Sequence, residues 1–375
     1  MHLLANAYYP ETMSKLSAAL FVTTCVLSLL GIFILYESSS YTALLNIGDK
    51  YYFVKNQSLW LILGVILCLV FSRINYKAYI KFALPLLLAT FALLISVFLP
   101  GIGVGLKGAH RWINLGFTVI QPSEILKITL ALYLAAWFSV KEKGKLLAFL
   151  ILLGLCIFLV VLEPDLGTAC IIASTAILVY FFQGAKVVEM LAILAIFILG
   201  VFLLIKVEPY RTERFNSYTK FDSHNLSTTS YHVKQILIAL GSGGITGVGF
   251  GKSVQKYAYL PENTTDSIFA IYAEETGYLG SLLLIVLFLI HLFLGYGIAI
   301  SSTDVFGRIL AFGIVTFLGI QTVINLASQV VLFPLTGVPL PFISYGGSSM
   351  LINFVSVGIL LSIAFHSHKH GRKST

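Results

Sequence analysis

Two acidic side chains stand just before a long apolar segment in the second half of the chain. Glu262 and Asp266 belong to the polar stretch PENTTDS, in which Thr265 directly precedes Asp266, and the sequence turns apolar after Ser267. An ionised carboxylate at the edge of an apolar segment needs a partner, water or a chemical task. Asp266 is therefore a candidate functional acid. The alternative is that its side chain only caps the helix that follows.

A second group of charges lies near the end of the first third. Arg111 stands beside Trp112, and Glu124 and Lys127 follow three residues apart after Pro122. On a helix, residues at this spacing share a face and can neutralise each other. Lys127 is thus either a functional cation or half of a structural ion pair.

A third acidic pair flanks a proline. Glu163 and Asp165 surround Pro164 in a tight turn between two apolar segments. Asp165 could cap the second segment, whereas Glu163 has no comparable structural explanation. If this turn and Arg111 converge with Asp266, the protein has an outward-facing polar cavity.

A glycine-rich run, GSGGITGVGFG from Gly241 to Gly251, precedes two lysines, Lys252 and Lys256. A phosphate-binding loop of the Walker type requires four residues between its first glycine and the Gly-Lys pair, and Gly247 leaves only three. A looser hypothesis is that the backbone amides and the lysines contact a pyrophosphate. The alternative is a flexible re-entrant turn.

The composition indicates which elements must position these residues. The chain has 375 residues, of which 58% are hydrophobic and 11% charged, and its mean hydropathy is +0.93. These values are typical of a multi-pass membrane protein and exclude an ordinary soluble domain. The net charge of +8 forms no basic stripe with stacking aromatics, which argues against nucleic-acid binding. The four cysteines lie within apolar runs and form no CxxC motif.

The hydropathy pattern predicts an all-α chain, a single domain over residues 1–375 with ten membrane-spanning helices. Each apolar segment is near the length that crosses a bilayer. The predicted spans are 16–36, 57–71, 79–99, 120–139, 146–162, 168–183, 187–205, 267–298, 307–331 and 343–365. A long loop, 206–266, remains; its first part carries Arg211, Arg214 and Lys220 among aromatic residues, a mixture that suits the headgroup layer.

The distribution of lysine and arginine predicts the orientation. With the N-terminus inside, the inner segments hold Lys15, Arg73, Lys77, Lys81, Lys141, Lys143, Lys145, Lys186, Arg308, Lys369, Arg372 and Lys373, and the short outer loops hold Lys50, Lys55, Lys107 and Arg111. Positive residues favour cytoplasmic loops, so twelve against four places both termini in the cytoplasm. The long loop, Glu163, Asp165 and Asp266 are then extracytoplasmic.

Several motifs together resemble one known family. They are LPENTTDSIFAIYAEETG around Asp266, Arg111-Trp112 with QPSE at 121–124, PDLGT at 164–168, and PLPFISYGGSS at 339–349. In this order, and over nearly the whole chain, they resemble the SEDS proteins of shape, elongation, division and sporulation. GFGKSVQKYAYLPE and ISYGGSS are more similar to the division branch, FtsW, than to the elongation branch, RodA.

The resemblance implies a function. SEDS proteins have ten transmembrane helices in the bacterial cytoplasmic membrane and polymerise lipid II into peptidoglycan glycan strands at its outer face. The implied partners are lipid II, a class B penicillin-binding protein as transpeptidase, and, for the division branch, other divisome proteins. No nucleic acid and no organic cofactor are expected.

The resemblance also implies roles for individual residues. Asp266 matches the essential aspartate, which as a general base would deprotonate the acceptor's 4-hydroxyl as it attacks the donor's anomeric carbon. The pyrophosphate leaving group calls for cations, for which Arg111, Lys127, Lys252 and Lys256 are candidates, together with a divalent cation, Mg²⁺ or Mn²⁺. The remaining substrate-binding candidates are Glu163, Asp165, Glu262, Thr265, Glu275 and Ser344.

Two positions depart from the family pattern, and other functions stay open. Ser267 replaces the usual phenylalanine after the aspartate, and Thr336 stands where division members can carry a lysine. The alternatives are a RodA-like polymerase of elongation, a flippase that moves the lipid-linked precursor, and a scaffold that only recruits a penicillin-binding protein. A flippase would need its charged site near the bilayer midplane rather than toward one side.

Overall fold

The computed structural model describes residues 2–106, 109–116, 118–140, 146–207 and 228–367. Within these ranges most residues are helical. The helices are α1 (His2–Ile47), α2 (Tyr52–Arg73), the 3₁₀ helix η1 (Tyr76–Phe82), α3 (Ala83–Ser96), α4 (Pro122–Phe138), α5 (Leu146–Leu162), α6 (Leu166–Phe182), α7 (Val187–Val207), α9 (Thr228–Gly243), α10 (Ile268–Ser301), α11 (Val305–Gln329) and α12 (Gly347–His366).

Each predicted span corresponds to a helix. Six helical segments of the described chain are long and apolar enough to cross a bilayer, and three shorter apolar helices lie at 146–162, 166–182 and 187–200. The remaining one, α4, has 17 residues and contains the charged residues Glu124 and Lys127. The ten-span count and its orientation stay predictions.

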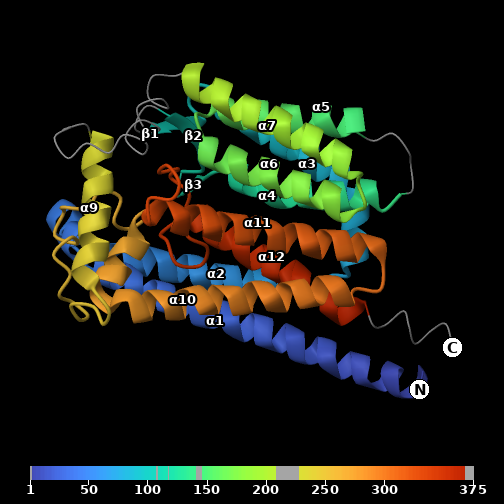
Figure 1. Cartoon of the computed structure of the whole chain (residues 1–375), viewed down its shortest axis with the longest axis horizontal. Helices are drawn as coiled ribbons and strands as arrows, with labels where there is room; N and C mark the ends of the chain where they lie inside the picture. The colour runs from blue at the N-terminus through green and yellow to red at the C-terminus, as the bar shows by residue number, and fades with distance from the viewer. Residues whose placement is uncertain (1, 107–108, 117, 141–145, 208–227, 368–375) are drawn as a thin grey trace.

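The helices form one elongated bundle (Figure 1). The start of α1 and the end of α12 lie at the same end of the bundle, and α9 and the strands lie at the opposite end, with α9 running across the other helices (Figure 1).

A small sheet corrects the prediction of an all-α chain. β1 (Gly103–Leu106), β2 (Ala109–Asn114) and β3 (Val119–Ile120) pair antiparallel in the order β1-β2-β3. Ile113 pairs with both Gly103 and Ile120, which makes β2 the central strand. These strands are too short to give a hydropathy signal beside long apolar helices, although β-branched and aromatic residues favour strands. The sheet carries Arg111.

The centre of the bundle is built around α11 and the segment that follows it. α11 packs against α4, α6 and α10, and α12 packs against α2. Between α11 and α12, residues 330–346 form a re-entrant loop without a helix, in which Val338, Leu340, Phe342 and Ile343 are buried. Non-helical backbone is tolerated at membrane depth only where protein groups satisfy it. The partners of this loop define the candidate site.

The long loop predicted at 206–266 is partly helical. α9 covers the apolar stretch predicted as a helix, Tyr231 to Leu240, and packs against α10. Arg211, Arg214 and Lys220 lie outside the described residues.

Candidate active site

α10 begins at the end of the bundle that carries α9 and the sheet (Figure 1), and Asp266 lies two residues before its first residue, Ile268. Its side chain is partly exposed. Ser267, not Asp266, is the N-cap residue of α10 and makes no side-chain capping bond. The helix boundary therefore does not place Asp266 at the N-cap position. The Ser267 hydroxyl instead lies 2.6 Å from Nε2 of His232 on α9. The serine that replaces the family's usual phenylalanine therefore has a hydrogen-bond partner.

The neighbours of Asp266 on its N-terminal side form a hydrogen-bonded frame. The Thr265 hydroxyl donates to the Glu262 carboxylate at 3.1 Å, and the Thr265 carbonyl accepts from the Ser344 hydroxyl at 2.6 Å. Ser344 in turn accepts from the amide of Leu340 at 2.9 Å. Glu262, Thr265 and Ser344, predicted as substrate-binding residues, therefore lie together beside Asp266 and tie it to the re-entrant loop.

Gly337 brings the re-entrant loop against the Asp266 carboxylate. Its φ of +76° is in the left-handed region, and a Cβ built there would stand 3.4 Å from Asp266 Oδ2. On the other side of this loop, a Cβ on Gly167 would stand 2.5 Å from a methyl of Val338 and 2.9 Å from Thr336. Gly167 thus permits close packing of the start of α6 on the loop. The predicted convergence of the 163–168 turn with Asp266 runs through residues 336–338.

Arg111 and Asp165 hold that turn. Arg111 Nε donates to the carbonyl of Glu163 at 2.9 Å, and its Nη2 donates to the carbonyl of Pro164. Asp165 caps α6 by accepting from the amide and hydroxyl of Thr168 at 3.0 and 2.8 Å, and it also accepts from Gln121 Nε2 at 3.0 Å. The capping alternative for Asp165 is therefore correct, and these bonds fix the turn.

Glu163 is different, because its side chain is fully buried. Neither carboxyl oxygen has a hydrogen-bond partner within the described part of the chain. Burial, reinforced by the nearby Asp165 and opposed by Arg111, raises the pKa of Glu163 to about 9. The side chain is consequently a neutral acid at neutral pH.

Lys127 is also buried, which argues against direct contact with a leaving group in this conformation. Its Nζ lies 2.8 Å from both carboxylate oxygens of Glu124 and donates to Gln321 Oε1 at 2.6 Å. Gln321 then donates to the carbonyl of Pro339 at 2.9 Å. The structural ion pair accounts for Lys127, and through Gln321 it connects α4 to the re-entrant loop.

The glycine run packs against a break in α10. Gly277 interrupts α10 with φ 67°, and the amides of Tyr278 and Leu279 donate to the carbonyls of Gly244 and Ile245 at 2.9 and 3.1 Å. A Cβ on Gly247 would stand 2.0 Å from the carbonyl oxygen of Glu275. Gly243 and Gly247 therefore permit close backbone contact with α10, and the hypothesis that this run binds a pyrophosphate stays a prediction.

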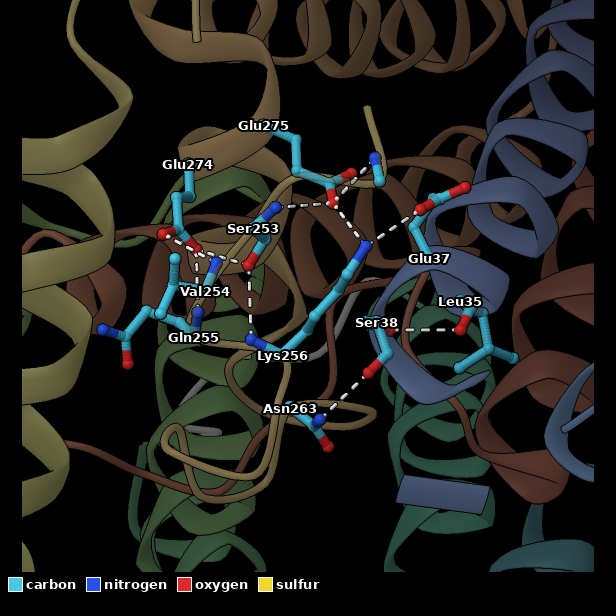
Figure 2. Close-up of polar contacts among 11 residues, drawn as sticks. Leu35, Glu37, Ser38, Ser253, Val254, Gln255, Lys256, Asn263, Glu274 and Glu275 are labelled. Carbon is cyan, nitrogen blue, oxygen red and sulfur yellow. Dashed lines mark hydrogen bonds and ion pairs between the residues drawn. The ribbon is translucent and has the colours of Figure 1, made fainter. Parts of the chain in front are cut away.

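Two adjacent glutamates of α10 anchor the residues after the glycine run (Figure 2). Glu274 accepts from the hydroxyl of Ser253 and the amides of Val254 and Gln255, the latter two at 3.2 and 3.3 Å. Glu275 Oε1 accepts from the amides of Gly251 and Ser253 at 3.1 and 3.4 Å.

Lys256 bridges two helices in the same network (Figure 2). Its Nζ lies 3.0 Å from Glu275 on α10 and 3.2 Å from Glu37 on α1. Burial opposes its charge, but these carboxylates outweigh it and raise the pKa of Lys256 above its ordinary value. Lys252 is exposed and makes no ion pair with any residue that the structure describes.

The residues near Asp266 do not build a metal cage. No group of three or more His, Cys, Asp or Glu side chains within the described ranges is placed to hold a metal ion. Mg²⁺ usually needs only one or two protein carboxylates when substrate phosphates supply further ligands. The divalent cation stays a prediction.

Sequence reasoning missed the amides that hold this site together. Gln321, Asn325 and Gln329 recur every four residues along α11, and Gln57 of α2 contacts the carbonyl of Ser344 at 3.0 Å. Polar residues inside apolar helices are costly and usually have a role. The spacing of four residues along one apolar helix was the signal from which these amides could have been predicted.

Comparison with known proteins shows similarity over nearly the whole chain. The FtsW/RodA/SpoVE family model, described as "Cell cycle protein", matches residues 17–369. A protein named probable peptidoglycan glycosyltransferase FtsW from Geobacter metallireducens is 37% identical over 344 residues, covering 90% of this chain and 92% of the relative. Stage V sporulation protein E of Bacillus subtilis is 35% identical over 354 residues, covering 93% and 96%.

Solved structures share the fold. The rod shape determining protein RodA of Thermus thermophilus superposes with a TM-score of 0.68 at 25% identity, covering 92% of this chain and 95% of that one. A chain from a solved structure described as "Structural coordination of polymerization and crosslinking by a peptidoglycan synthase complex" gives a TM-score of 0.78 at 24% identity, covering 93% and 97%. On the match over residues 17–369 and these full-length relatives, the chain belongs to the FtsW/RodA/SpoVE family.

Proposed function

We propose that this protein is a peptidoglycan glycosyltransferase that polymerises lipid II at the outer face of the bacterial cytoplasmic membrane, in septal synthesis during division. The observation that carries the proposal is the partly exposed carboxylate of Asp266, held beside Gly337 at one end of a membrane-protein bundle. The names of the FtsW relatives support the reaction and the division role. A RodA-like role in elongation is the alternative within the family.

The reaction follows from the residues around Asp266. The carboxylate accepts the proton of the acceptor sugar's 4-hydroxyl while that oxygen bonds to the donor's anomeric carbon. The bond from the anomeric carbon to the pyrophosphate oxygen breaks, and the lipid pyrophosphate leaves with the electron pair. One base suffices because the leaving group needs no protonation, unlike glycoside hydrolysis, where two carboxyl groups are usual.

Of the cations predicted to absorb leaving-group charge, we retain Lys252 for this role, because it is exposed and makes no ion pair with the described residues. Arg111 is bonded to two backbone carbonyls, and Lys127 and Lys256 are engaged in ion pairs. A divalent cation bound to the pyrophosphate would supply the remaining charge. The proposal includes a class B penicillin-binding protein as the transpeptidase partner, because a chain of similar fold comes from a peptidoglycan synthase complex that couples polymerization to crosslinking.

A flippase is the competing function, and the position of Asp266 disfavours it. Asp266 precedes the first residue of α10 rather than lying midway along it, whereas carrier sites lie near the midplane. The test is to reconstitute the purified protein with its cognate class B penicillin-binding protein in liposomes that contain lipid II and Mg²⁺. Glycan strands support the polymerase. Lipid II translocation without polymer would overturn it in favour of the flippase.

A further inference from the structure

Three amide side chains lie along one face of α11, one turn apart. Gln321, Asn325 and Gln329 stand at i, i+4 and i+8, the spacing that aligns side chains on a helix face. All three are buried, with at most 1% of their surface exposed. A buried amide is costly unless it is hydrogen-bonded, so the partners of this amide ladder explain its presence.

Every rung of the amide ladder donates to a backbone carbonyl near the candidate base. Gln321 Nε2 donates to Pro339 at 2.9 Å and Asn325 Nδ2 to Val338 at 2.8 Å. Asn325 and Gln329 both donate to the carbonyl of Asp266, at 3.2 and 2.8 Å. Because a carbonyl oxygen can only accept, the amide nitrogens must face these groups.

The amide ladder therefore holds both sides of one close contact. Asp266 forms one side, and the backbone after Gly337 forms the other, at a separation where a Cβ on Gly337 would lie 3.4 Å from Asp266 Oδ2. Both are bonded to α11, a 25-residue helix that packs against α4, α6 and α10. Loop residues on their own would not fix this separation, because loops are more mobile than the elements they connect.

We propose that Asn325 and Gln329 are positioning residues, which set the Asp266 carboxylate at the place where the acceptor hydroxyl arrives. This inference rests on the proposed polymerase function and extends it to residues of a helix that contributes no base. The carbonyl oxygens of these amides, Asn325 Oδ1 and Gln329 Oε1, have no hydrogen-bond partner among the described residues. A side chain kept only for packing would not carry an unpaired acceptor, since leucine or methionine would fill the same volume without it.

The test compares Asn325→Leu, Gln329→Met and the double variant with Gln57→Met. Gln57 is equally buried and bonds the same re-entrant loop at Ser344 and Gly346, at 3.0 and 3.2 Å, but does not contact Asp266. Gln57→Met therefore measures the decrease in kcat that results only from weakening the re-entrant loop. Rates are measured with lipid II and the partner transpeptidase present, and unfolding temperatures and partner binding are recorded for each variant.

We expect each single variant to lower kcat about 10-fold with KM nearly unchanged, and the double variant to lower it by more than the product of the two, because either donor can hold the shared carbonyl. If the double variant does not fold, the two single variants against Gln57→Met decide the matter. A kcat loss no greater than that of Gln57→Met at equal stability overturns the positioning role while the wild-type polymerase stands. A wild type that makes no glycan overturns both.

Discussion

At the residue scale, two carboxyl groups near one loop have opposite surroundings. Asp266 is partly exposed and its backbone is held by two amides, whereas Glu163 is fully buried without a partner in the described chain. Exposure keeps a carboxylate able to meet a substrate hydroxyl, and burial favours the neutral acid. Sequence spacing suggested both as functional acids, and only their burial separates them.

The raised pKa of Glu163 predicts a pH dependence of stability. Its pKa is about 9 in the folded protein and near the ordinary 4.5 when unfolded, so between these values the folded state binds the extra proton. The free energy of unfolding should then fall as pH rises through this window, by at most about 1.4 kcal/mol per pH unit. Thermal unfolding in detergent across the window should show a shallower decline for Glu163→Gln than for wild type. Equal declines would contradict the assignment.

Gly337→Ala tests the close contact between Gly337 and the Asp266 carboxylate. The left-handed backbone costs alanine about 1 kcal/mol, and the new methyl would stand 3.4 Å from Asp266 Oδ2. Gly48 is the matched control, because its φ is +85° and a Cβ there meets nothing within 4 Å. We expect similar losses of stability from both alanines, but a loss of polymerisation of about 10-fold or more from Gly337→Ala alone. Equal polymerisation by the two variants would mean that the close contact at Gly337 does not matter for activity.

At the element scale, close backbone contacts join the segments that carry the site. α9 and the glycine run approach α10 so closely that several positions cannot accept a Cβ. α4 and α11 are joined through Lys127 and Gln321 to the re-entrant loop. Direct contacts of this kind fix the positions of the secondary elements relative to one another. They can therefore hold a catalytic group in the position that the reaction requires.

Two glycines of α9 test the contact between α9 and α10. A Cβ on Gly243 would stand 2.4 Å from the carbonyl oxygen of Ala273, whereas a Cβ on Gly241 meets nothing within 4 Å. Gly241→Ala should be neutral or stabilise by up to about 1 kcal/mol through helix propensity. Gly243→Ala should destabilise by about 1–3 kcal/mol because α9 must move away. Unfolding temperatures of the two variants decide, and a stabilised Gly243→Ala would contradict the packing.

The buried ion pair of α4 predicts a non-additive result. Lys127→Met leaves the carboxylate of Glu124, with a side chain 3% exposed, without its cation. The expected cost is about 3–5 kcal/mol of unfolding free energy. Adding Glu124→Gln should recover part of it, since no unpaired charge remains. A double variant as unstable as the sum of both singles would argue that Lys127 acts outside the pair.

At the scale of the whole molecule, the sequence predicted the helices far better than their partners. Each apolar segment marked helical structure, and local signals found the cap at Asp165 and the pairing of Glu124 with Lys127. Contacts between distant positions left no local signal, because they depend on the fold. The pairing of Lys256 with Glu37, 219 residues apart, is one example.

The contacts between the re-entrant loop and the amide ladder also join distant positions and left no local signal in the sequence. From the sequence, the loop is expected to be a simple connection between two spans. In the structure its apolar residues are buried, and its carbonyls accept hydrogen bonds from Gln321 and Asn325. A hydropathy profile could not predict these contacts. The amides lower the hydropathy of α11, but the profile does not show which groups they bond. The strands were not predicted because they are too short to give a hydropathy signal.

The central claim is that Asp266 is the base of a lipid II polymerase, and the most direct measurement is the rate of glycan formation by Asp266→Asn. Asparagine keeps the size of the side chain and removes the proton acceptor. With the folded variant still bound to its transpeptidase partner, the account predicts a fall of at least about 100-fold relative to wild type. Glycan strands formed at the wild-type rate would contradict it and place the base elsewhere.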